Sequence, residues 1–359
     1  MLANESRVHE IDGLRGIAIL SVVVFHMMIL HLEPSVEVDT TDGLTLLAYG
    51  VDLFFVVSGF LIGTILLRIE SPSGIGAFYI RRIVRIWPLY YLLLFVVYSA
   101  LPDKSLFADA PYWSFIFFVF NFWESMGLGI NQLLGPLWSV AIEEQFYMIG
   151  PLLFSTLGRK QIAFFLLACL FLSPLLRLVL LFNTDIDLWR FTPARIDGIC
   201  AGLLLSLFLS SAENVAFVVK HIKFFKYLMF SLLILLYPFQ VIFSDVVWVS
   251  FGHSLVVLAF ACVLLVVQVQ SSLGQRVRLL NWGFLRYLGL RCYSIYLFHM
   301  FFGYLAIAIS DNVFVDLIIA WSLILLFAHF SWRYIEAPFL NFGRKFSYRK
   351  SESLDRAAA

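Results

Sequence analysis

Apolar residues occur along this chain in runs of about twenty, and the short segments between the runs carry most of the charge. A helix that crosses the hydrocarbon core of a membrane needs roughly 20 predominantly apolar residues. About ten runs meet this requirement, and we expect a spanning helix near 13–32, 46–67, 83–101, 138–157, 161–182, 195–211, 225–243, 247–268, 292–310 and 313–334. The pattern therefore predicts an all-α integral membrane protein with about ten transmembrane helices.

The charged segments predict which loops face the cytoplasm, because Lys and Arg are concentrated in cytoplasmic loops. The basic loops, which we expect in the cytoplasm, are 81–85, 159–160, 220–226 and 276–291. The alternate segments are acidic and poor in cations, and should face outside: 33–42, 103–109, 185–187, and those around Asp245 and Asp311. This assignment places both termini in the cytoplasm, with a membrane domain over 1–340 followed by a basic cytoplasmic tail over 341–359.

A further apolar run, Tyr112–Trp123, is too short to span a membrane as a helix. The alternation of loop charge also requires that it does not cross, since the helix before it exits outward and the helix after it enters from outside. We therefore predict a re-entrant or interfacial segment over 112–137. Such backbone is tolerated at membrane depth only where it is buried in protein or lines a cavity.

Composition excludes several classes of protein. A hydrophobic share of 61% and a charged share of 14% are incompatible with a water-exposed surface for 359 residues. The net charge of +1 provides no basic face, so we expect membrane lipid and not nucleic acid as a partner. The four cysteines lie singly in or beside apolar runs, which indicates neither a zinc site nor a disulfide framework. We expect no metal, and the oligomeric state stays open.

Ionisable side chains inside spanning helices are costly, so each one is a candidate functional residue. The first helix carries Arg15 near its cytoplasmic end and His26 eleven residues later, roughly 16 Å further across the membrane. The second helix enters from outside, with Asp52 a few residues deep and Ser58 near the middle. These residues supply a base, a carboxylate and a cation to the interior of the membrane.

Two more helices complete a polarised set of candidates. Arg82 and Arg85 lie three residues apart at the cytoplasmic mouth of the third helix, where one helical face can hold both against a phosphate. Glu143 lies about two turns into the fourth helix, at a depth comparable with His26 and Asp52. The pattern indicates acid–base chemistry in the outer half of the membrane and anion binding at its cytoplasmic side.

Several candidates also have a purely structural interpretation. His26 could be a helix-packing donor, and Arg82 and Arg85 could serve only to set the topology. Ser58, with Gly59 beside it, could simply allow close approach of helices, which is the commonest use of small residues in membranes.

Other ionisable residues divide between the same two interpretations. Glu144 should face a different side of its helix from Glu143 and could be a structural partner, so we favour Glu143 as the functional carboxylate. His299 fits packing and a functional site equally well. The motif residues Arg195, Asp197 and Glu336 are more typical of intramembrane ion pairs than of catalysts.

A series of motifs follows one order along the chain. It runs R-x10-H (Arg15 to His26), "FFVVSGFLI", R-x-x-R before "IWPLYY", "LWSVAIEEQFY", "RIDGICAGLL", "YSIYLFH" and "WRYIEAP". Over nearly the whole chain, this order resembles the membrane acyltransferase family 3, whose members acylate extracytoplasmic glycans and other hydroxyl acceptors. The resemblance implies a multi-pass protein of the bacterial inner membrane that uses cytoplasmic acyl-CoA, usually acetyl-CoA. It also implies an extracytoplasmic carbohydrate acceptor, such as lipopolysaccharide, an exopolysaccharide or a lipid-linked sugar. Some members carry a fused extracytoplasmic domain, and we expect this chain to resemble those that stand alone.

The resemblance also implies roles for individual residues. His26 matches the family's catalytic histidine, and Glu143 matches the glutamate of its Trp-Ser…Glu motif. Arg15, Arg82 and Arg85 match its essential arginines. The remaining motif residues are expected to bind substrate or to be structural: Ser58, Trp138, Ser139 and His299.

These assignments give a mechanistic hypothesis. Arg82 and Arg85, with Arg15 deeper in the membrane, would bind the phosphates of acyl-CoA by charge-assisted hydrogen bonds. His26 would act as general base on the acceptor hydroxyl, with Glu143 or Asp52 orienting its ring. A relay through an acyl-histidine stays open. So does a different class, a secondary transporter or flippase for a glycan or anionic solute, although the chain shows no sign of the repeated halves common in transporters.

Overall fold

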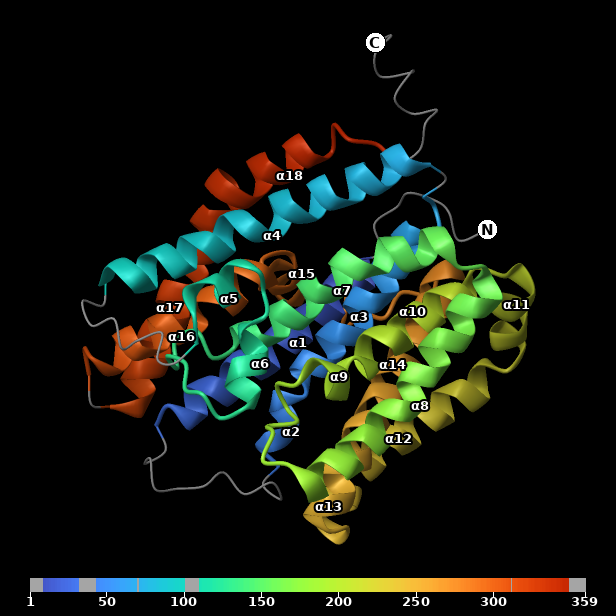
Figure 1. Ribbon diagram of the computed structural model, residues 1–359, viewed down its shortest axis with the longest axis horizontal. Helices are drawn as coiled ribbons and strands as arrows, with labels where there is room; N and C mark the ends of the chain where they lie inside the picture. The colour runs from blue at the N-terminus through green and yellow to red at the C-terminus, as the bar shows by residue number, and fades with distance from the viewer. Residues whose placement is uncertain (1–8, 32–42, 70, 101–109, 311, 349–359) are drawn as a thin grey trace. The chain divides into compact units, whose positions relative to one another are not determined.

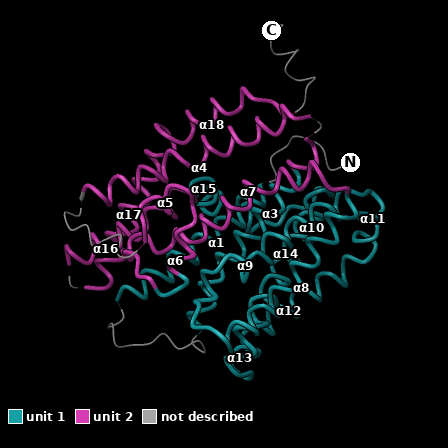
Figure 2. Tube along the Cα trace, viewed as in Figure 1, with its two compact units in different colours: residues 1–64, 125–127, 159–292 teal, residues 65–124, 128–158, 293–359 magenta. Residues whose placement is uncertain are grey.

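The computed structural model describes residues 9–31, 43–69, 71–100, 110–310 and 312–348, which form helices, turns and loops without a strand (Figure 1). These residues fall into two compact units that are described separately, each made of segments far apart in sequence (Figure 2). Unit 1 takes in 1–64, 125–127 and 159–292, and unit 2 takes in 65–124, 128–158 and 293–359, in each case as far as these residues are described.

The helices of unit 1 are α1 (His9–Ile29), α2 (Thr45–Ala48), α3 (Gly50–Leu66, whose last two residues belong to unit 2), α8 (Arg159–Asn183), α9 (Thr192–Arg195), α10 (Asp197–Leu209), α11 (Ala212–Lys220), α12 (Ile222–Ile242), α13 (Asp245–Val247), η2 (Trp248–Gly252), α14 (His253–Ser272) and α15 (Gly283–Leu290). Those of unit 2 are α4 (Pro72–Ala100), α5 (Tyr112–Ile116), α6 (Phe120–Ser125), α7 (Leu137–Thr156), α16 (Cys292–Ile307), α17 (Val313–Ser331), η3 (Trp332–Glu336) and α18 (Ala337–Gly343). The end residues Ser125 and Cys292 are grouped with unit 1.

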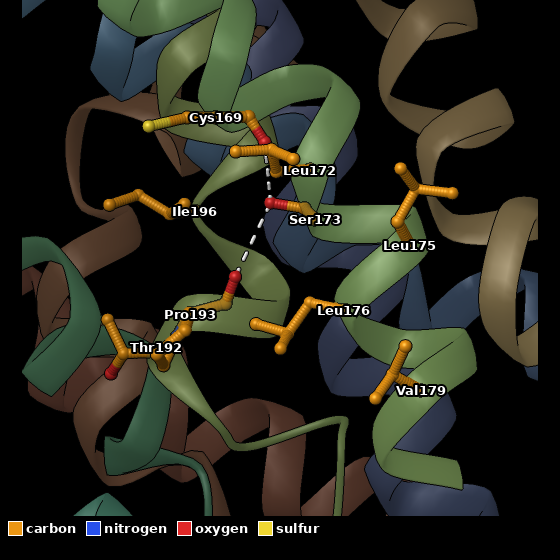
Figure 3. Close-up of a pocket in the computed structure, with 9 residues that line it drawn as sticks. All are labelled: Cys169, Leu172, Ser173, Leu175, Leu176, Val179, Thr192, Pro193 and Ile196. Atoms are coloured by element: carbon orange, nitrogen blue, oxygen red, sulfur yellow. Dashed lines mark hydrogen bonds between the residues drawn. The ribbon is translucent and has the colours of Figure 1, made fainter. Parts of the chain in front are cut away.

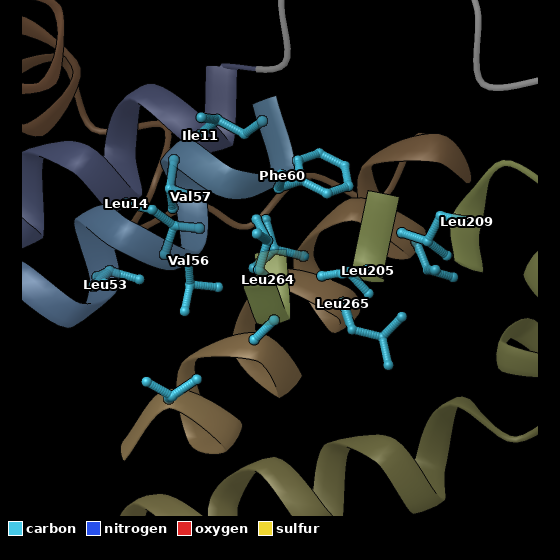
Figure 4. Close-up of a cluster of buried hydrophobic side chains, with 14 of the residues drawn as sticks. Ile11, Leu14, Leu53, Val56, Val57, Phe60, Leu205, Leu209, Leu264 and Leu265 are labelled. Carbon is cyan, nitrogen blue, oxygen red and sulfur yellow. The ribbon is translucent and has the colours of Figure 1, made fainter. Parts of the chain in front are cut away.

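The core of unit 1 is formed by aliphatic side chains from helices α1, α3, α10 and α14. Leu14, Val56, Leu205 and Leu264 are among its buried members, and Phe60 is the aromatic residue of the cluster (Figure 4). Burial of such side chains does not by itself hold helices together in a membrane, because lipid tails are equally apolar. Close packing and polar contacts between the helices must therefore stabilise this unit.

Helices α3 and α10 approach each other closely because both carry glycine at the crossing. A Cβ atom on Gly59 would lie 2.2 Å from the carbonyl oxygen of Ile199, and one on Gly202 would lie 2.1 Å from that of Val56. Neither position can accept a side chain unless the helices separate. For Gly59, the neighbour of Ser58, the structure thus supports a role in close helix packing.

In unit 2, α4 packs against α7 and runs beside α18 (Figure 1). Tyr79 of α4 donates a hydrogen bond to the carbonyl of Met148 on α7 at 2.8 Å, and Arg81 donates one to the carbonyl of Gly343 at 3.2 Å. Tyr293 of α16 donates one to the carbonyl of Ile86 at 2.7 Å. Helix α4 is therefore the element on which the other helices of this unit converge.

The segment predicted to be re-entrant or interfacial forms the two short helices α5 and α6, of five and six residues. At about 1.5 Å per residue, neither could cross a membrane. They are joined through Phe118, whose positive φ of 55° is unusual for a bulky residue, and whose ring packs at a tilt of 36° against that of Tyr90. The carbonyls of Phe115 and Phe118 accept hydrogen bonds from Tyr90 and Gln145 at 2.9 and 2.7 Å. The carbonyl near the end of α5 and the one in the link to α6 thus both have protein partners.

The all-helical fold is confirmed among the described residues, and six to eight helices are long and apolar enough to span a membrane. Six are long and apolar enough alone or with the helix that continues them. Two pairs of helices, α10 with α11 and α15 with α16, meet this requirement only when the two members are taken together. The other two predicted spans correspond to α4 and α7, which carry the arginine and glutamate motifs, and they stay predictions, as do the positions of the termini. Residues 349–359 of the predicted tail lie outside the described residues.

The glycine contact between α3 and α10 predicts a large effect of a single methyl group. Gly59→Ala should lower the free energy of unfolding by about 1–3 kcal/mol, because overpacking forces the backbones apart. Gly76→Ala on α4 is the matched control, since a Cβ there meets no atom within 4 Å. Thermal unfolding of both variants in detergent would measure this difference, and equal stability of the two would contradict the proposed close contact.

Candidate functional site

Helix α1 presents Arg15 and His26 on the same face. Eleven residues correspond to about three helical turns, which returns the side chains to nearly the same direction with a separation of roughly 16 Å along the axis. Both residues are half-buried, and α1 packs along α15 within unit 1. The R-x10-H spacing therefore places a cation and a base in one line along the helix.

The ring of His26 is held by its own helix. Its Nδ1 atom lies 2.9 Å from the carbonyl oxygen of Val22, one turn earlier. A carbonyl only accepts, so in the neutral ring Nδ1 carries the proton and Nε2 carries the lone pair. This tautomer directs the basic nitrogen to the outer edge of the ring, which is the arrangement required of a general base.

Arg15 is positioned by a cysteine. Its Nη2 atom donates to the Sγ atom of Cys292 at 2.9 Å, and Cys292 is buried. A thiol is a weak acceptor that carries no charge, so this contact orients the guanidinium without neutralising it. The contact with Cys292 therefore fixes the direction of the Arg15 guanidinium.

Asp52 lies in an ion pair that the sequence did not reveal. Both of its carboxylate oxygens accept hydrogen bonds from Nη2 of Arg195, at 2.8 and 2.9 Å, and both side chains are almost fully buried. Arg195 also contacts Nδ1 of buried His253, and its guanidinium lies 4.6 Å from the ring of Trp189. Asp52 is thus paired with Arg195 of α9, and its role beside His26, which the sequence offered as an alternative to Glu143, stays a prediction.

A second buried ion pair joins α8 to α10. Arg177 donates from Nη1 and Nη2 to the same oxygen of Asp197 at 3.1 Å, and from Nε to the carbonyl of Ser250 at 2.9 Å. Its other contacts are the carbonyl of Ala194 and the hydroxyl of Ser254, which itself donates to Asp197 at 2.8 Å. All five donors of this guanidinium are therefore used within unit 1.

The ion-pair interpretation of Arg195 and Asp197 is therefore confirmed. For Glu336, the third residue of that group, the structure gives a different contact: Ser331 donates to its Oε1 at 3.3 Å within unit 2.

In unit 2, Arg82 and Glu143 are linked through one tyrosine. The guanidinium carbon of Arg82 lies 5.7 Å from the ring centre of Phe78 and 5.8 Å from that of Tyr147. The hydroxyl of Tyr147 donates to Glu143 at 2.9 Å. Arg85 lies three residues after Arg82 on α4 and is half-buried, which is the spacing of neighbours on one helical face. The two arginines are therefore arranged as a pair of cations on α4.

The two adjacent glutamates of α7 face different neighbours, as the sequence suggested. Glu144 is buried, and its Oε2 accepts a hydrogen bond from Nε1 of Trp87 at 3.0 Å. Glu143 is half-buried and bonds within its own helix to Tyr147. Glu144 thus connects α7 to α4, while Glu143 is the more accessible carboxylate.

The remaining predicted residues of unit 2 lie around the start of α7. Trp138 is buried, and Ser139 shares a 2.6 Å hydrogen bond with the hydroxyl of Tyr296, which donates to the carbonyl of Pro136 at 2.7 Å. Nδ1 of buried His299 lies 2.6 Å from the carbonyl of Tyr296. These contacts join α7 to α16 and support a structural interpretation of Ser139.

The predicted site residues are divided between the two units. Arg15, His26, Asp52 and Ser58 belong to unit 1, and the rest belong to unit 2: Arg82, Arg85, Trp138, Ser139, Glu143 and His299. Among the described residues, no group of three His, Cys, Asp or Glu side chains has the geometry to hold a metal ion.

Sequence analysis missed three residues that the structure places at these networks. Arg177 is an arginine within an apolar run, and an ionisable residue in such a run is a candidate functional residue. His253 lies at the start of α14, where its role depends on Arg195 from a distant segment. Arg190, in the loop before α9, lies near enough to His26 to act on it electrostatically. Its position in a short polar loop gave no signal.

Comparison with known proteins identifies the family of the chain. Residues 8–332 match the family described as "Acyltransferase domain", so the chain belongs to that acyltransferase family. Its members are multi-pass membrane proteins, which agrees with the apolar helices found here. No solved structure is significantly similar to the chain.

The curated relatives are longer than this chain. A provisionally named O-acetyltransferase of Staphylococcus aureus (strain COL) is 29% identical over 93% of this chain and 58% of its own length. A provisionally named peptidoglycan O-acetyltransferase, YrhL of Bacillus subtilis (strain 168), is 30% identical over 94% of this chain and 56% of its own length. The peptidoglycan O-acetyltransferase OatA of Listeria monocytogenes is 36% identical over 40% of this chain and 24% of its own length. The chain thus spans little more than half of the first two.

The buried pair Arg177–Asp197 predicts a strong dependence of stability on both partners. Arg177→Met should lower the free energy of unfolding by about 3–5 kcal/mol, because it leaves Asp197 buried without its cation. The double variant with Asp197→Leu should be more stable than Arg177→Met alone. Thermal unfolding in detergent would measure both effects.

The control for these variants is Arg190→Met. It removes the arginine of the Arg190–Asp187 ion pair, whose two side chains are 38% and 33% exposed, respectively. We expect a loss of about 1 kcal/mol or less for such an exposed pair. Additive losses in the Arg177 and Asp197 variants would contradict the coupling inferred here.

Proposed function

We propose that this chain is a membrane O-acyltransferase that moves an acyl group, most simply acetyl, from cytoplasmic acyl-CoA to a hydroxyl of an extracytoplasmic carbohydrate. The observation that carries the proposal is the arrangement on α1, where Arg15 shares a face with His26 and the tautomer of His26 leaves a basic Nε2. Family membership supports the same chemistry. The names of two relatives favour a cell-wall glycan such as peptidoglycan as the acceptor.

The donor is proposed to bind through its phosphates. Coenzyme A carries a diphosphate and a 3′-phosphate at one end of a long, thin arm, so its site needs several cations at one end. Arg82 and Arg85 lie three residues apart on α4, and Arg15 of α1 donates to the thiol of Cys292. Guanidinium groups bind phosphate oxygens with two hydrogen bonds at a time, which makes arginine well suited to this task.

The transfer itself is proposed to begin at Nε2 of His26, which takes the proton from the acceptor hydroxyl. The oxygen then attacks the thioester carbonyl, a C–O bond forms, and the C–S bond breaks. The departing thiolate takes the proton back from the imidazolium, so that an ester and coenzyme A are the products. We assign Glu143 as the carboxylate of the reaction, since Asp52 is bound to Arg195 and Glu144 to Trp87.

This proposal predicts that His26→Ala and His26→Gln abolish acyl transfer while donor binding persists. The imidazole is the base in the mechanism, and neither replacement can accept the proton, so a loss of about 10²–10⁴-fold is expected. The measurement uses purified protein in liposomes with radiolabelled acetyl-CoA and a glycan acceptor. Donor binding is measured separately by equilibrium dialysis.

His31→Ala is the matched control, because this histidine lies just beyond α1 and makes the same contact with a backbone carbonyl one turn earlier, at 2.8 Å. It should leave transfer unchanged. Full transfer by a folded His26→Ala variant would contradict the assignment, and solute flux without label transfer would favour a transporter instead.

A further inference from the structure

Unit 1 contains an open cavity of about 580 Å³ that the proposed chemistry does not use. Leucine and valine side chains of α8 form one wall, among them Leu172, Leu176 and Val179, and Pro193 and Ile196 form the other (Figure 3). We call this cavity the α8 groove. Its residues all come from 169–196, so the groove is complete within one unit.

The polar side chains of the α8 groove have partners in the protein. The hydroxyl of Ser173 donates to the carbonyl of Cys169 at 2.8 Å and lies 3.4 Å from that of Pro193, as Figure 3 shows. The thiol of Cys169 lies beside Cys200, and Thr192 also has a polar partner. The groove therefore offers aliphatic contact and little hydrogen bonding, which suits a hydrocarbon chain.

The position of the groove on α8 indicates where such a chain would come from. Helix α8 is one of the six that can span a membrane alone, and most of its surface is not buried by the protein. Leu172 and Val179, for example, are 58% and 57% exposed. With Arg159 at the cytoplasmic end, the groove lies in the second half of the helix, roughly 6–20 Å from its outer end at Asn183. In the orientation that the loop charges predict, the groove opens to the outer half of the bilayer.

The second wall of the groove lies close in sequence to a residue near His26. Pro193 follows Arg190 by three residues, so the two can be at most about 10 Å apart along the chain. Arg190 forms an ion pair with Asp187 and lies near enough to His26 to act on it electrostatically. A molecule whose chain occupied the groove would therefore hold its polar head close to the loop that approaches the proposed base.

From these contacts we infer that the α8 groove binds the hydrocarbon chain of a lipid-linked carbohydrate acceptor in the outer leaflet. The inference rests on the proposed function and names its acceptor class: a sugar attached to a lipid anchor. The aliphatic walls bind the anchor, and the loop with Arg190 receives the sugar. A bulk phospholipid would fill the same walls, but it carries no carbohydrate hydroxyl for His26 to activate.

The inference is tested with two probes, dodecyl and methyl β-glycosides of N-acetylglucosamine, in lipid nanodiscs with labelled acetyl-CoA. Leu172→Trp fills the groove and should raise KM for the dodecyl glycoside about tenfold, the loss of roughly two buried methylenes, without changing KM for the methyl glycoside. Leu167→Trp is the matched control, an exposed leucine of α8 outside the groove, and should change neither. Equal KM values of the wild-type protein for the two glycosides would overturn the inference.

Photo-crosslinking separates this inference from the proposed function. A dodecyl glycoside with a diazirine in its chain should label peptides within 169–196, as mapped by mass spectrometry, and Leu172→Trp should reduce the labelling. Labelling there without any acetylation would support the groove and contradict acyl transfer. Acetylation with labelling elsewhere would overturn the groove alone. Equal displacement of the probe by phosphatidylglycerol would also overturn it, since the site would then be a general lipid contact.

Discussion

The structure of unit 1 depends most on the pairing of buried arginines with aspartates inside apolar helices. Arg177 and Arg195 are almost completely buried, and each is matched by an aspartate, Asp197 and Asp52. An unpaired charge at these positions would cost several kcal/mol, so each pair forms only if α3, α8, α9 and α10 are in register. The glycine contacts between α3 and α10 permit this register by letting the two backbones touch.

This arrangement separates structural charges from those proposed to act in chemistry. Arg177 and Arg195 bind aspartates within unit 1, whereas Arg15 donates to the thiol of Cys292 and His26 contacts a backbone carbonyl. In unit 2, Glu144 is buried and accepts a hydrogen bond from Trp87, whereas the half-buried Glu143 accepts one from Tyr147. The packing thus orients Arg15, His26 and Glu143 through hydrogen bonds to a thiol, a backbone carbonyl and a tyrosine hydroxyl.

Much of this could be predicted from sequence, because length, hydropathy and motif order are local properties. Helices occur at all the predicted runs, the segment after Tyr112 forms only short helices, and the family assignment is confirmed. The partner of Asp52 could not be predicted, because Arg195 is more than a hundred residues away and the pairing depends on tertiary packing. Arg177 could have been identified as an arginine inside an apolar run. Arg190 could not, because it lies in a loop and its importance depends on which residues the fold brings near it.

The central claim is that His26 activates an outer hydroxyl toward a donor supplied from the cytoplasmic side. It is tested most directly in proteoliposomes of defined orientation, with radiolabelled acetyl-CoA in one compartment and a glycan acceptor in the other. The account predicts labelled acceptor when the donor is on the cytoplasmic face, and none when the compartments are exchanged. Labelling that requires donor and acceptor on the same side, or that is unchanged in His26→Ala, would contradict it.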